Sequence, residues 1–266
     1  MLATAINLVR AAGDLLRQGH YNGSGRAASK SSAVDLVTEY DLASERLITA
    51  GLRQHFPDYA ILGEEGDHTL PAAGPVWVID PVDGTTNFAH GFPVFSISLA
   101  LLVDRQPELG VVYDPLRDDL FWAQRGQGAW RGERRLQVAP SSSLESSLLA
   151  TGFPYDRASN ADNNLAEFSY FMPRTRGVRR AGSAALDMAW VAAGWVNGYW
   201  ERGVQVWDMA AAVLMVSEAG GLVTTYSGRP WQPGDRTVVG AHSTVHALLL
   251  NGIAEARGGR HLPMLE

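Results

Sequence analysis

The chain has 266 residues, 46% of them hydrophobic, with 22 Lys and Arg against 28 Asp and Glu and a formal net charge of −6 at pH 7. This length and hydrophobic content support one large domain or two closely packed ones and exclude an intrinsically disordered chain. The absence of cysteine excludes disulfides, thiolate metal sites and a cysteine nucleophile. An acidic balance with a single lysine, Lys30, argues against generic binding to nucleic acid or to an anionic membrane surface.

The apolar runs of the chain are too short to cross a membrane. Residues 94–103 and 209–216 form such runs, and both are far shorter than the roughly 20 residues that span a bilayer. The first residues lack the basic stretch and uninterrupted apolar core of a signal peptide. We therefore expect a cytoplasmic protein.

The first half of the chain is predicted to contain two helices and a mostly antiparallel sheet. Apolar residues recur at helical spacing over 2–18, whereas the small and polar residues of 19–34 predict a loop. A second helix is predicted over 40–56, with Asp41 at its cap position and Pro57 after its end. Short β-like runs follow at 59–62, 76–80, 95–103, 109–113 and 120–123.

After about Pro140 strands and helices alternate, which predicts an α/β layer packed on the first half. We expect one body made of an N-terminal half, 1–140, and a C-terminal half, 141–266, with the site in the crevice between them. The predicted strands are 147–151, 177–180, 199–201, 222–224 and 238–241. The predicted helices are 160–171, 183–193, 207–219 and 243–256.

Two carboxylates mark the end of one apolar strand, in the segment 77–93, WVIDPVDGTTNFAHGFP. The strand delivers Asp80, Pro81 turns the chain, and Asp83 comes three positions after Asp80. Carboxylates this close repel unless a cation lies between them, and hard oxygen ligands suit Mg²⁺ or Mn²⁺. A simple Asp-Pro turn, with Asp83 capping the segment after it, explains the same residues without any function.

Small residues come directly after these carboxylates. Gly84, Thr85 and Thr86 offer backbone N–H groups in an arrangement that can cradle a phosphate. An ordinary turn at the start of a helix has the same geometry and serves as the alternative interpretation.

Three further sets of acids stand at the ends of apolar segments. Glu64 and Glu65 come after a short strand beside glycine, and Asp208 stands where a helix begins. Each has an explanation without function: the glutamates as a solvated loop pair, and Asp208 as a first-turn acid favoured by the helix dipole. Asp35 and Asp41 are open to the same explanation, with Asp41 as an N-cap.

Taken together, five blocks of sequence resemble the inositol monophosphatase family of magnesium-dependent phosphatases in order and spacing. The blocks are KSSAVDLVTEYD (30–41), GEE (63–65), WVIDPVDGTTNFAHGFP (77–93), RRAGSAALDMAWVAAG (179–194) and YWERGVQVWDMAAAVLMVSEAGG (199–221). The resemblance covers nearly the whole chain. It implies the layered αβαβα sandwich shared with sugar phosphatases such as fructose-1,6-bisphosphatase, usually as a homodimer, and inhibition by lithium.

The resemblance implies a metal site. The implied ligands are Glu64, Asp80, Asp83, Asp208 and the backbone carbonyl of Val82, around two or three Mg²⁺ ions, with Mn²⁺ as an alternative. Paired ions about 3.5 to 4 Å apart can clamp the attacking and leaving oxygens of an in-line displacement.

The resemblance also implies the catalytic groups. Asp41 and the Thr85 hydroxyl orient and activate the attacking water, and Glu64 is counted with them. The implied reaction is direct attack on phosphorus, without a phosphoenzyme.

The implied substrate-binding residues include phosphate donors and groups that contact the leaving alcohol. They are Gly84, Thr85, Thr86, Lys30, Gly182, Ser183, Ala184 and Glu201. Gln205 stands where some relatives carry histidine, which leaves the choice of substrate open. We interpret His90 as a packing or loop residue and five tryptophans as layer-packing aromatics, namely Trp77, Trp190, Trp195, Trp200 and Trp207.

Two rival interpretations remain at this point. The DPVDGT segment approaches the D-x-D-G-T motif of haloacid-dehalogenase phosphatases, but Asp80 and Asp83 are three apart rather than two, which changes the face of the second carboxylate. The non-enzymatic rival is a protein-binding, transcription-associated role, which no feature of the sequence demands. Within the phosphatase interpretation we favour inositol-1-phosphate, then fructose-1,6-bisphosphate, with histidinol phosphate and 3′-phosphoadenosine-5′-phosphate as further alternatives.

Overall fold

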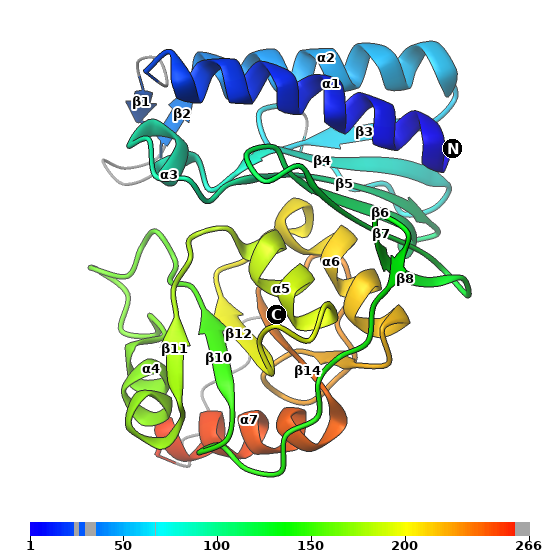
Figure 1. The fold of residues 1–266 in the computed structure, drawn as a ribbon. Coiled ribbons are helices and arrows are strands. Elements are labelled where there is room, and N and C mark those ends of the chain that lie inside the picture. Colours follow the sequence, from blue (N-terminus) through cyan, green and yellow to red (C-terminus); the bar gives the residue numbers. More distant parts are fainter. Residues whose placement is uncertain (24–26, 30–35, 67, 259–266) are drawn as a thin grey trace.

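Helices and sheets alternate in five layers (Figure 1). The structure is a computed structural model and describes residues 1–23, 27–29, 36–66 and 68–258. From one side to the other, the layers are α1 and α2, a seven-stranded sheet, α5 and α6, a five-stranded sheet, and α4 and α7 (Figure 1). This arrangement confirms the predicted αβαβα sandwich.

The elements have the following bounds. The helices are α1 Leu2–Tyr21, α2 Glu39–His55, α3 Thr85–Ala89, α4 Leu165–Phe171, the 3₁₀ helix η1 Met172–Arg174, α5 Ala184–Ala192, α6 Val206–Glu218 and α7 Ser243–Ala256. The strands are β1 Ala27–Ser29, β2 Leu36–Thr38, β3 Ala60–Gly63, β4 Pro75–Asp83, β5 Ser96–Val103, β6 Gln106–Asp114, β7 Asp119–Gln124, β8 Gly128–Arg131, β9 Arg134–Arg135, β10 Leu148–Thr151, β11 Gly177–Arg179, β12 Gly198–Arg202, β13 Leu222–Thr224 and β14 Thr237–Ala241.

The two large sheets differ in their strand directions. The seven-stranded sheet has the order β3-β4-β5-β6-β7-β8-β9, and only β3 and β4 pair in parallel. The five-stranded sheet has the order β11-β10-β12-β14-β13, with β10 parallel to both of its neighbours. The first sheet takes its strands from residues 60–135 and the second from 148–241. The division of the chain at residue 140 into two halves stays a prediction.

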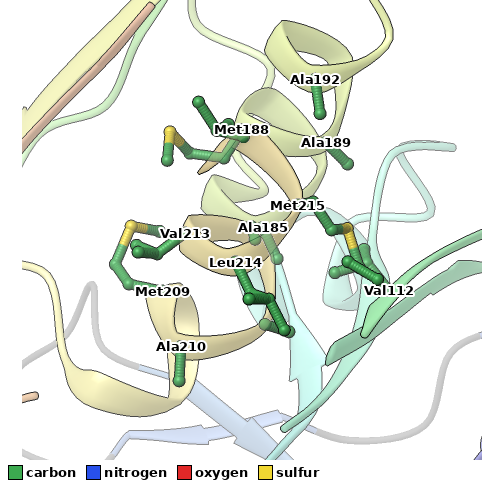
Figure 2. Packing of buried hydrophobic residues seen from close by; sticks show 14 of the residues in the cluster. Val112, Ala185, Met188, Ala189, Ala192, Met209, Ala210, Val213, Leu214 and Met215 are labelled. Atoms are coloured by element: carbon green, nitrogen blue, oxygen red, sulfur yellow. The ribbon is translucent and has the colours of Figure 1, made fainter. Parts of the chain in front are cut away.

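The middle helices are buried from both sides, which explains their composition. α6 is apolar along most of its length and presents alanines that let the sheet approach closely, as at Gly110 of β6, which faces the backbone of Ala211. Figure 2 shows the side chains of Met188, Met209 and Met215 filling the space around the two helices. Burial on every side removes the polar stripe of a surface helix.

Some predicted elements need correction. The loop predicted over 19–34 is wrong in part, because α1 continues to Tyr21 and β1 pairs with β2; residues 24–26 and 30–34 lie outside the described part. The helix predicted over 160–171 begins only at Leu165, since Asn164 has a positive φ of 70° that ends any helix before it. The short β8 and β9 were not predicted, because glycine and arginine interrupt their apolar pattern.

Among the described residues, no helix is long and apolar enough to span a bilayer.

The tryptophans interpreted as packing residues differ in their exposure. Trp77 and Trp200 are fully buried. Trp195 contradicts that interpretation, since 46% of its surface is exposed and Arg131 lies over its ring.

We predict that Gly110→Ala destabilises the protein by about 1–3 kcal/mol, because a Cβ at this position would lie 2.6 Å from the backbone oxygen of Ala211. Gly51→Ala in α2 is the control, since its Cβ would meet only the flexible side chain of Leu8 and alanine favours the helix. Urea denaturation measures both. Equal losses for the two variants would contradict the close packing of α6 on β6.

Candidate functional site

The end of β4 supplies two carboxylates through an irregularity in the strand. β4 continues to Asp83, and its pairing with β5 shifts register between Asp80 and Asp83. The turn predicted at Pro81 is therefore wrong: a β-bulge tolerates a residue without an N–H, so the strand runs through the proline. The Ser44 hydroxyl of α2 donates to the Pro81 carbonyl at 3.1 Å and holds the bulge.

Asp83 connects the seven-stranded sheet to the middle layer. Its Oδ2 accepts hydrogen bonds from the Ser183 hydroxyl at 2.6 Å and from the backbone N–H of Ala185 at 2.7 Å, while Oδ1 accepts from the N–H of Ala184 at 3.1 Å. Ser96 of β5 donates to Oδ2 at 3.4 Å. Burial raises the pKa of Asp83, and these hydrogen bonds oppose the rise. The carboxylate thus caps the positive end of α5.

Asp41 lies at the third position of α2 rather than at its cap. Thr38 is the N-cap: its hydroxyl accepts from the Asp41 N–H, and the Thr38 N–H donates to Asp41 Oδ2 at 2.9 Å. The prediction of Asp41 as the cap is wrong because this capping box places the acid three residues inside. Asp41 is completely buried.

The Thr85 hydroxyl joins Asp41 to the end of β4. Its Oγ1 lies 2.9 Å from Asp41 Oδ1 and 3.0 Å from the carbonyl oxygen of Val82. A hydroxyl donates one hydrogen bond and can accept two. Thr85 can therefore donate to one of these oxygens and still accept a hydrogen bond from another group. The structure therefore brings together the two residues predicted to handle water.

Three more acids lie close enough to affect one another's ionisation. Burial, followed by the charges of Glu64, Asp83 and Asp208, raises the pKa of Asp80 well above its ordinary value of 3.8. Glu64 also shares a hydrogen bond with Asp80 that favours the protonated acid. Burial, followed by Asp83 and Glu64, raises the pKa of Asp208 in the same way. The four predicted acidic ligands thus form one electrostatic cluster.

This cluster fits a hard divalent cation by its chemistry. Buried carboxylates that raise one another's pKa are relieved when a cation neutralises them, and Mg²⁺ and Mn²⁺ prefer oxygen ligands. Within the described residues, however, no three acidic or histidine side chains are grouped around a point that could hold a metal ion as they stand. Asp83 explains part of this, because both of its oxygens face the first turn of α5.

Glu201 of β12 lies at the predicted substrate side. Burial raises the pKa of Glu201 to about 7, against the lowering effects of the Tyr199 hydroxyl and the Arg180 charge. Tyr199 donates a hydrogen bond to Glu201 Oε2. A Cβ on Gly152 would lie 2.2 Å from this carboxylate, so a side chain there would displace the Glu201 carboxylate from its observed place.

The phosphate-side and alcohol-side residues touch at two glycines. Gly84 has a φ of 99°, and a Cβ there would lie 2.9 Å from the carbonyl oxygen of Gly182. Ser183 is the N-cap of α5, and Ala184 begins that helix. Thr86 lies in the short α3. These predicted substrate residues therefore lie together, whereas Lys30 and Asp35 fall outside the described residues.

Two residues near the site were missed by the sequence interpretation. Asn87 of α3 donates from Nδ2 to the carbonyl oxygens of Val94 at 2.7 Å and Ala181 at 2.8 Å, which ties α3 to the end of β11. Asp187 of α5 is buried, and its Oδ1 has no hydrogen-bond partner among the described residues. Burial, followed by the charges of Glu201 and Asp83, raises the pKa of Asp187 well above 3.8. The one indication in the sequence that Asp187 is buried was its place inside an otherwise apolar helix.

Gln205 lies beside the carboxylate cluster, whereas His90 lies at the surface. Gln205 is the N-cap of α6, and its backbone N–H donates to Asp208 Oδ2 at 2.8 Å. Gln205 therefore contacts a predicted metal ligand. His90 is the residue after α3 and is exposed at the edge of a pocket.

Five layers, with a cluster of buried and half-buried carboxylates at the junction of one sheet and the middle helices, define a layered α/β protein with an acidic site. A family model described as the inositol monophosphatase family matches residues 1–258. The chain belongs to the inositol monophosphatase family.

Individual relatives carry two kinds of name. An inositol-1-monophosphatase of Synechocystis sp. is 45% identical over 226 residues, covering 85% of this chain and 79% of that protein. A protein named Nus factor SuhB, of Pseudomonas aeruginosa, is 45% identical over 233 residues and covers 86% of each chain. The solved inositol monophosphatase of Anabaena (Nostoc) sp. has a TM-score of 0.86 at 41% identity, over 96% of this chain and 95% of the other.

We predict that Asp187→Asn stabilises the metal-free protein at alkaline pH. A raised pKa means that folded Asp187 keeps a proton that the unfolded chain releases, so stability falls as pH rises from about 3.8 through the raised pKa. Each pKa unit corresponds to about 1.4 kcal/mol. We expect the variant to gain at least about 1 kcal/mol over the original chain at pH 8 and much less at pH 4.

Urea denaturation in the presence of a chelator measures this difference. Asp58→Asn is the control, because the Asp58 side chain is exposed to solvent and lies outside the carboxylate cluster. A gain that is the same at both pH values, or that the control shares, would contradict a proton held on Asp187.

Proposed function

We propose that this protein hydrolyses a small phosphate monoester, with inositol-1-phosphate as the favoured substrate. The observation that carries the proposal is the cluster of Glu64, Asp80, Asp83 and Asp208, whose charges act on one another at the end of β4. Proteins rarely bury several acids together without a cation to neutralise them. The family is generally metal-dependent, which agrees with this chemistry.

The acids of the cluster and the Val82 carbonyl would hold Mg²⁺, in two or three sites, with Mn²⁺ as a substitute. When bound, such ions lower the pKa of a water and neutralise charge on the phosphate. Asp83 can bind a cation through Oδ1 while it caps α5, because Oδ1 accepts one hydrogen bond, from Ala184, and a carboxylate oxygen has two acceptor positions.

Thr85 and Asp41 would position the attacking water and take its proton. Thr85 Oγ1 can accept a hydrogen bond from the water while its own proton points to Asp41 Oδ1, 2.9 Å away. Asp41 cannot turn away, because its Oδ2 accepts from the Thr38 backbone and hydroxyl. A buried carboxylate held in this way is suited to general-base work.

The C-terminal half would recognise the leaving alcohol. Glu201 would accept a hydrogen bond from a sugar or inositol hydroxyl, and Gly182, Ser183 and Ala184 would contact the same alcohol. Gly84, Thr85 and Thr86 would donate to the phosphate from the other side. Fructose-1,6-bisphosphate is the second candidate substrate, followed by histidinol phosphate and 3′-phosphoadenosine-5′-phosphate. Inhibition by lithium and a homodimeric assembly belong to the same proposal.

A second candidate function is binding to the transcription machinery. It is favoured by the name Nus factor SuhB, which relatives from Pseudomonas aeruginosa and Escherichia coli carry at 45% and 38% identity. A stable partner recovered in a pull-down, equally with the original chain and with Asp83→Asn, would support a role that does not depend on the reaction.

We predict that Asp83→Asn lowers phosphate release by about 100-fold or more, because a charge-assisted contact is worth up to about 3 kcal/mol. Phosphate release is measured from inositol-1-phosphate and the three other candidate substrates, with Mg²⁺ and with a chelator. Asp58→Asn is the control. Activity that survives the chelator or the substitution would overturn the metal-assisted mechanism.

We predict that Thr85→Val lowers kcat by about 10²-fold or more, whereas Thr85→Ser keeps most of the activity, because only the hydroxyl can join the water to Asp41. The valine variant keeps the shape of the side chain but leaves the buried Asp41 Oδ1 without this donor, so we expect it to unfold at a lower urea concentration than the serine variant. Both variants are therefore assayed without urea, after their folding has been checked. Equal activity of the valine and serine variants would exclude Thr85 from handling the water.

A further inference from the structure

One turn of α2 presents three polar side chains to the acidic end of the seven-stranded sheet. Asp41, Ser44 and Glu45 are three and four positions apart, so they lie on one face of the helix, and α2 contacts β4. Asp41 contacts the Thr85 hydroxyl, and Ser44 holds the bulge of β4. The third side chain, Glu45, contacts the segment that carries Glu64.

The Glu45 carboxylate lies against the turn that follows β3. Its Oε2 accepts a hydrogen bond from the backbone N–H of Glu65 at 2.9 Å. The turn is closed by the Gly66 N–H, which donates to the Gly63 carbonyl at 3.4 Å. A Cβ on Gly63 would lie 2.5 Å from the Glu45 carboxyl carbon, and a Cβ on Gly66 would lie 2.9 Å from Glu45 Oε1. Glycine at both ends of the turn therefore leaves room for this carboxylate.

Glu64 is half-buried in the middle of this turn. Its backbone N–H donates to the carbonyl of Ile79 at 3.1 Å, and its own carbonyl accepts from His68 Nε2 at 2.7 Å. Its side chain shares a hydrogen bond with Asp80, the residue after Ile79. Because β4 holds the N–H of Glu64 and Glu45 holds the next N–H of the chain, the direction of the Glu64 side chain is fixed from two elements.

This arrangement matters for the binding of a cation. A ligand on a turn that is already held in place loses little conformational freedom when the cation binds. Partners that orient a ligand without touching the metal typically change metal affinity by about 10- to 100-fold when they are lost. Glu45 stands in this relation to Glu64, since its hydrogen bond is to the neighbouring peptide.

We infer that Glu45 is a positioning residue for Glu64, which it holds toward the divalent cation through the backbone of Glu65. The inference rests on the proposed binding of a cation by the carboxylate cluster. One turn of α2 then sets three parts of the site at once: the water-handling hydroxyl of Thr85, the bulge of β4 and the Glu64 ligand.

Two variants separate the reach of the Glu45 side chain from its charge. Glu45→Gln keeps the length and an acceptor oxygen but loses the charge, whereas Glu45→Asp keeps the charge but is one methylene too short. Titration of the chelated and dialysed protein with Mn²⁺ measures affinity through the electron paramagnetic resonance signal of free Mn²⁺. We expect Glu45→Asp to lower the affinity by about tenfold or more, and Glu45→Gln to lower it by less than about threefold, because the hydrogen bond remains.

Phosphate release at increasing Mg²⁺ gives a second measurement. Glu45→Asp should need about tenfold more Mg²⁺ for half-maximal activity, while its kcat at saturating Mg²⁺ should approach that of the original chain. Glu39→Asp and Glu39→Gln are the matched controls, because Glu39 is an exposed glutamate at the start of the same helix. Neither control should change the affinity for Mn²⁺.

Urea denaturation with a chelator checks the folding of every variant. Lower stability of Glu45→Asp with unchanged affinity for Mn²⁺ would show a purely structural role and overturn the inference. A larger loss of affinity in Glu45→Gln than in Glu45→Asp would also overturn it, because charge rather than reach would then matter. Both results leave the proposed phosphatase activity intact. Absence of Mn²⁺ binding to the original chain would overturn the cation site and the inference together.

Discussion

The carboxylate of Asp83 is the contact on which the site depends. It ends strand β4 of the seven-stranded sheet and accepts hydrogen bonds from Ser183, Ala184 and Ala185 at the start of α5 in the next layer. A buried acid is unfavourable unless donors or a cation satisfy it. Because the donors come from the start of α5, the seven-stranded sheet and the middle helices must pack correctly before these carboxylates are in place.

The same constraint explains why so many glycines and small residues surround the site. Gly84 and Gly182 let two backbones approach closely, and Gly152 leaves room for the Glu201 carboxylate. The buried, apolar α5 and α6 pack against each other (Figure 2) and contact strands of both sheets, which fixes the positions of these segments. Rigid layers thus support a site made of strand ends, turns and helix starts, where acids and backbone N–H groups are available.

Much of this could be predicted from the sequence, but not all. Periodicity revealed most elements, including α7 at its observed bounds, and the resemblance of five blocks revealed the layered fold. The bulge at Pro81 was missed because proline after aspartate favours a turn locally, and only pairing with β5 keeps the strand extended. Asp41 was predicted as the cap of α2, but Thr38, three residues earlier, is the cap and Asp41 is its partner in a capping box. Both threonine and aspartate are common caps, so the local sequence does not distinguish the two positions. The apolar pattern around Asp187 indicates a buried acid, but it does not indicate Glu201 as the neighbour, because that neighbour comes from the packing of α5 on β12.

The central claim, that the carboxylates at the end of β4 bind a divalent cation, is tested most directly by equilibrium titration of the chelated protein with Mg²⁺ or Mn²⁺. We expect saturable binding to the original chain and a loss of at least about tenfold in affinity in Asp80→Asn, whose amide oxygen still accepts the Val82 N–H. Binding that is absent in the original chain, or equally strong in the variant, would contradict the claim.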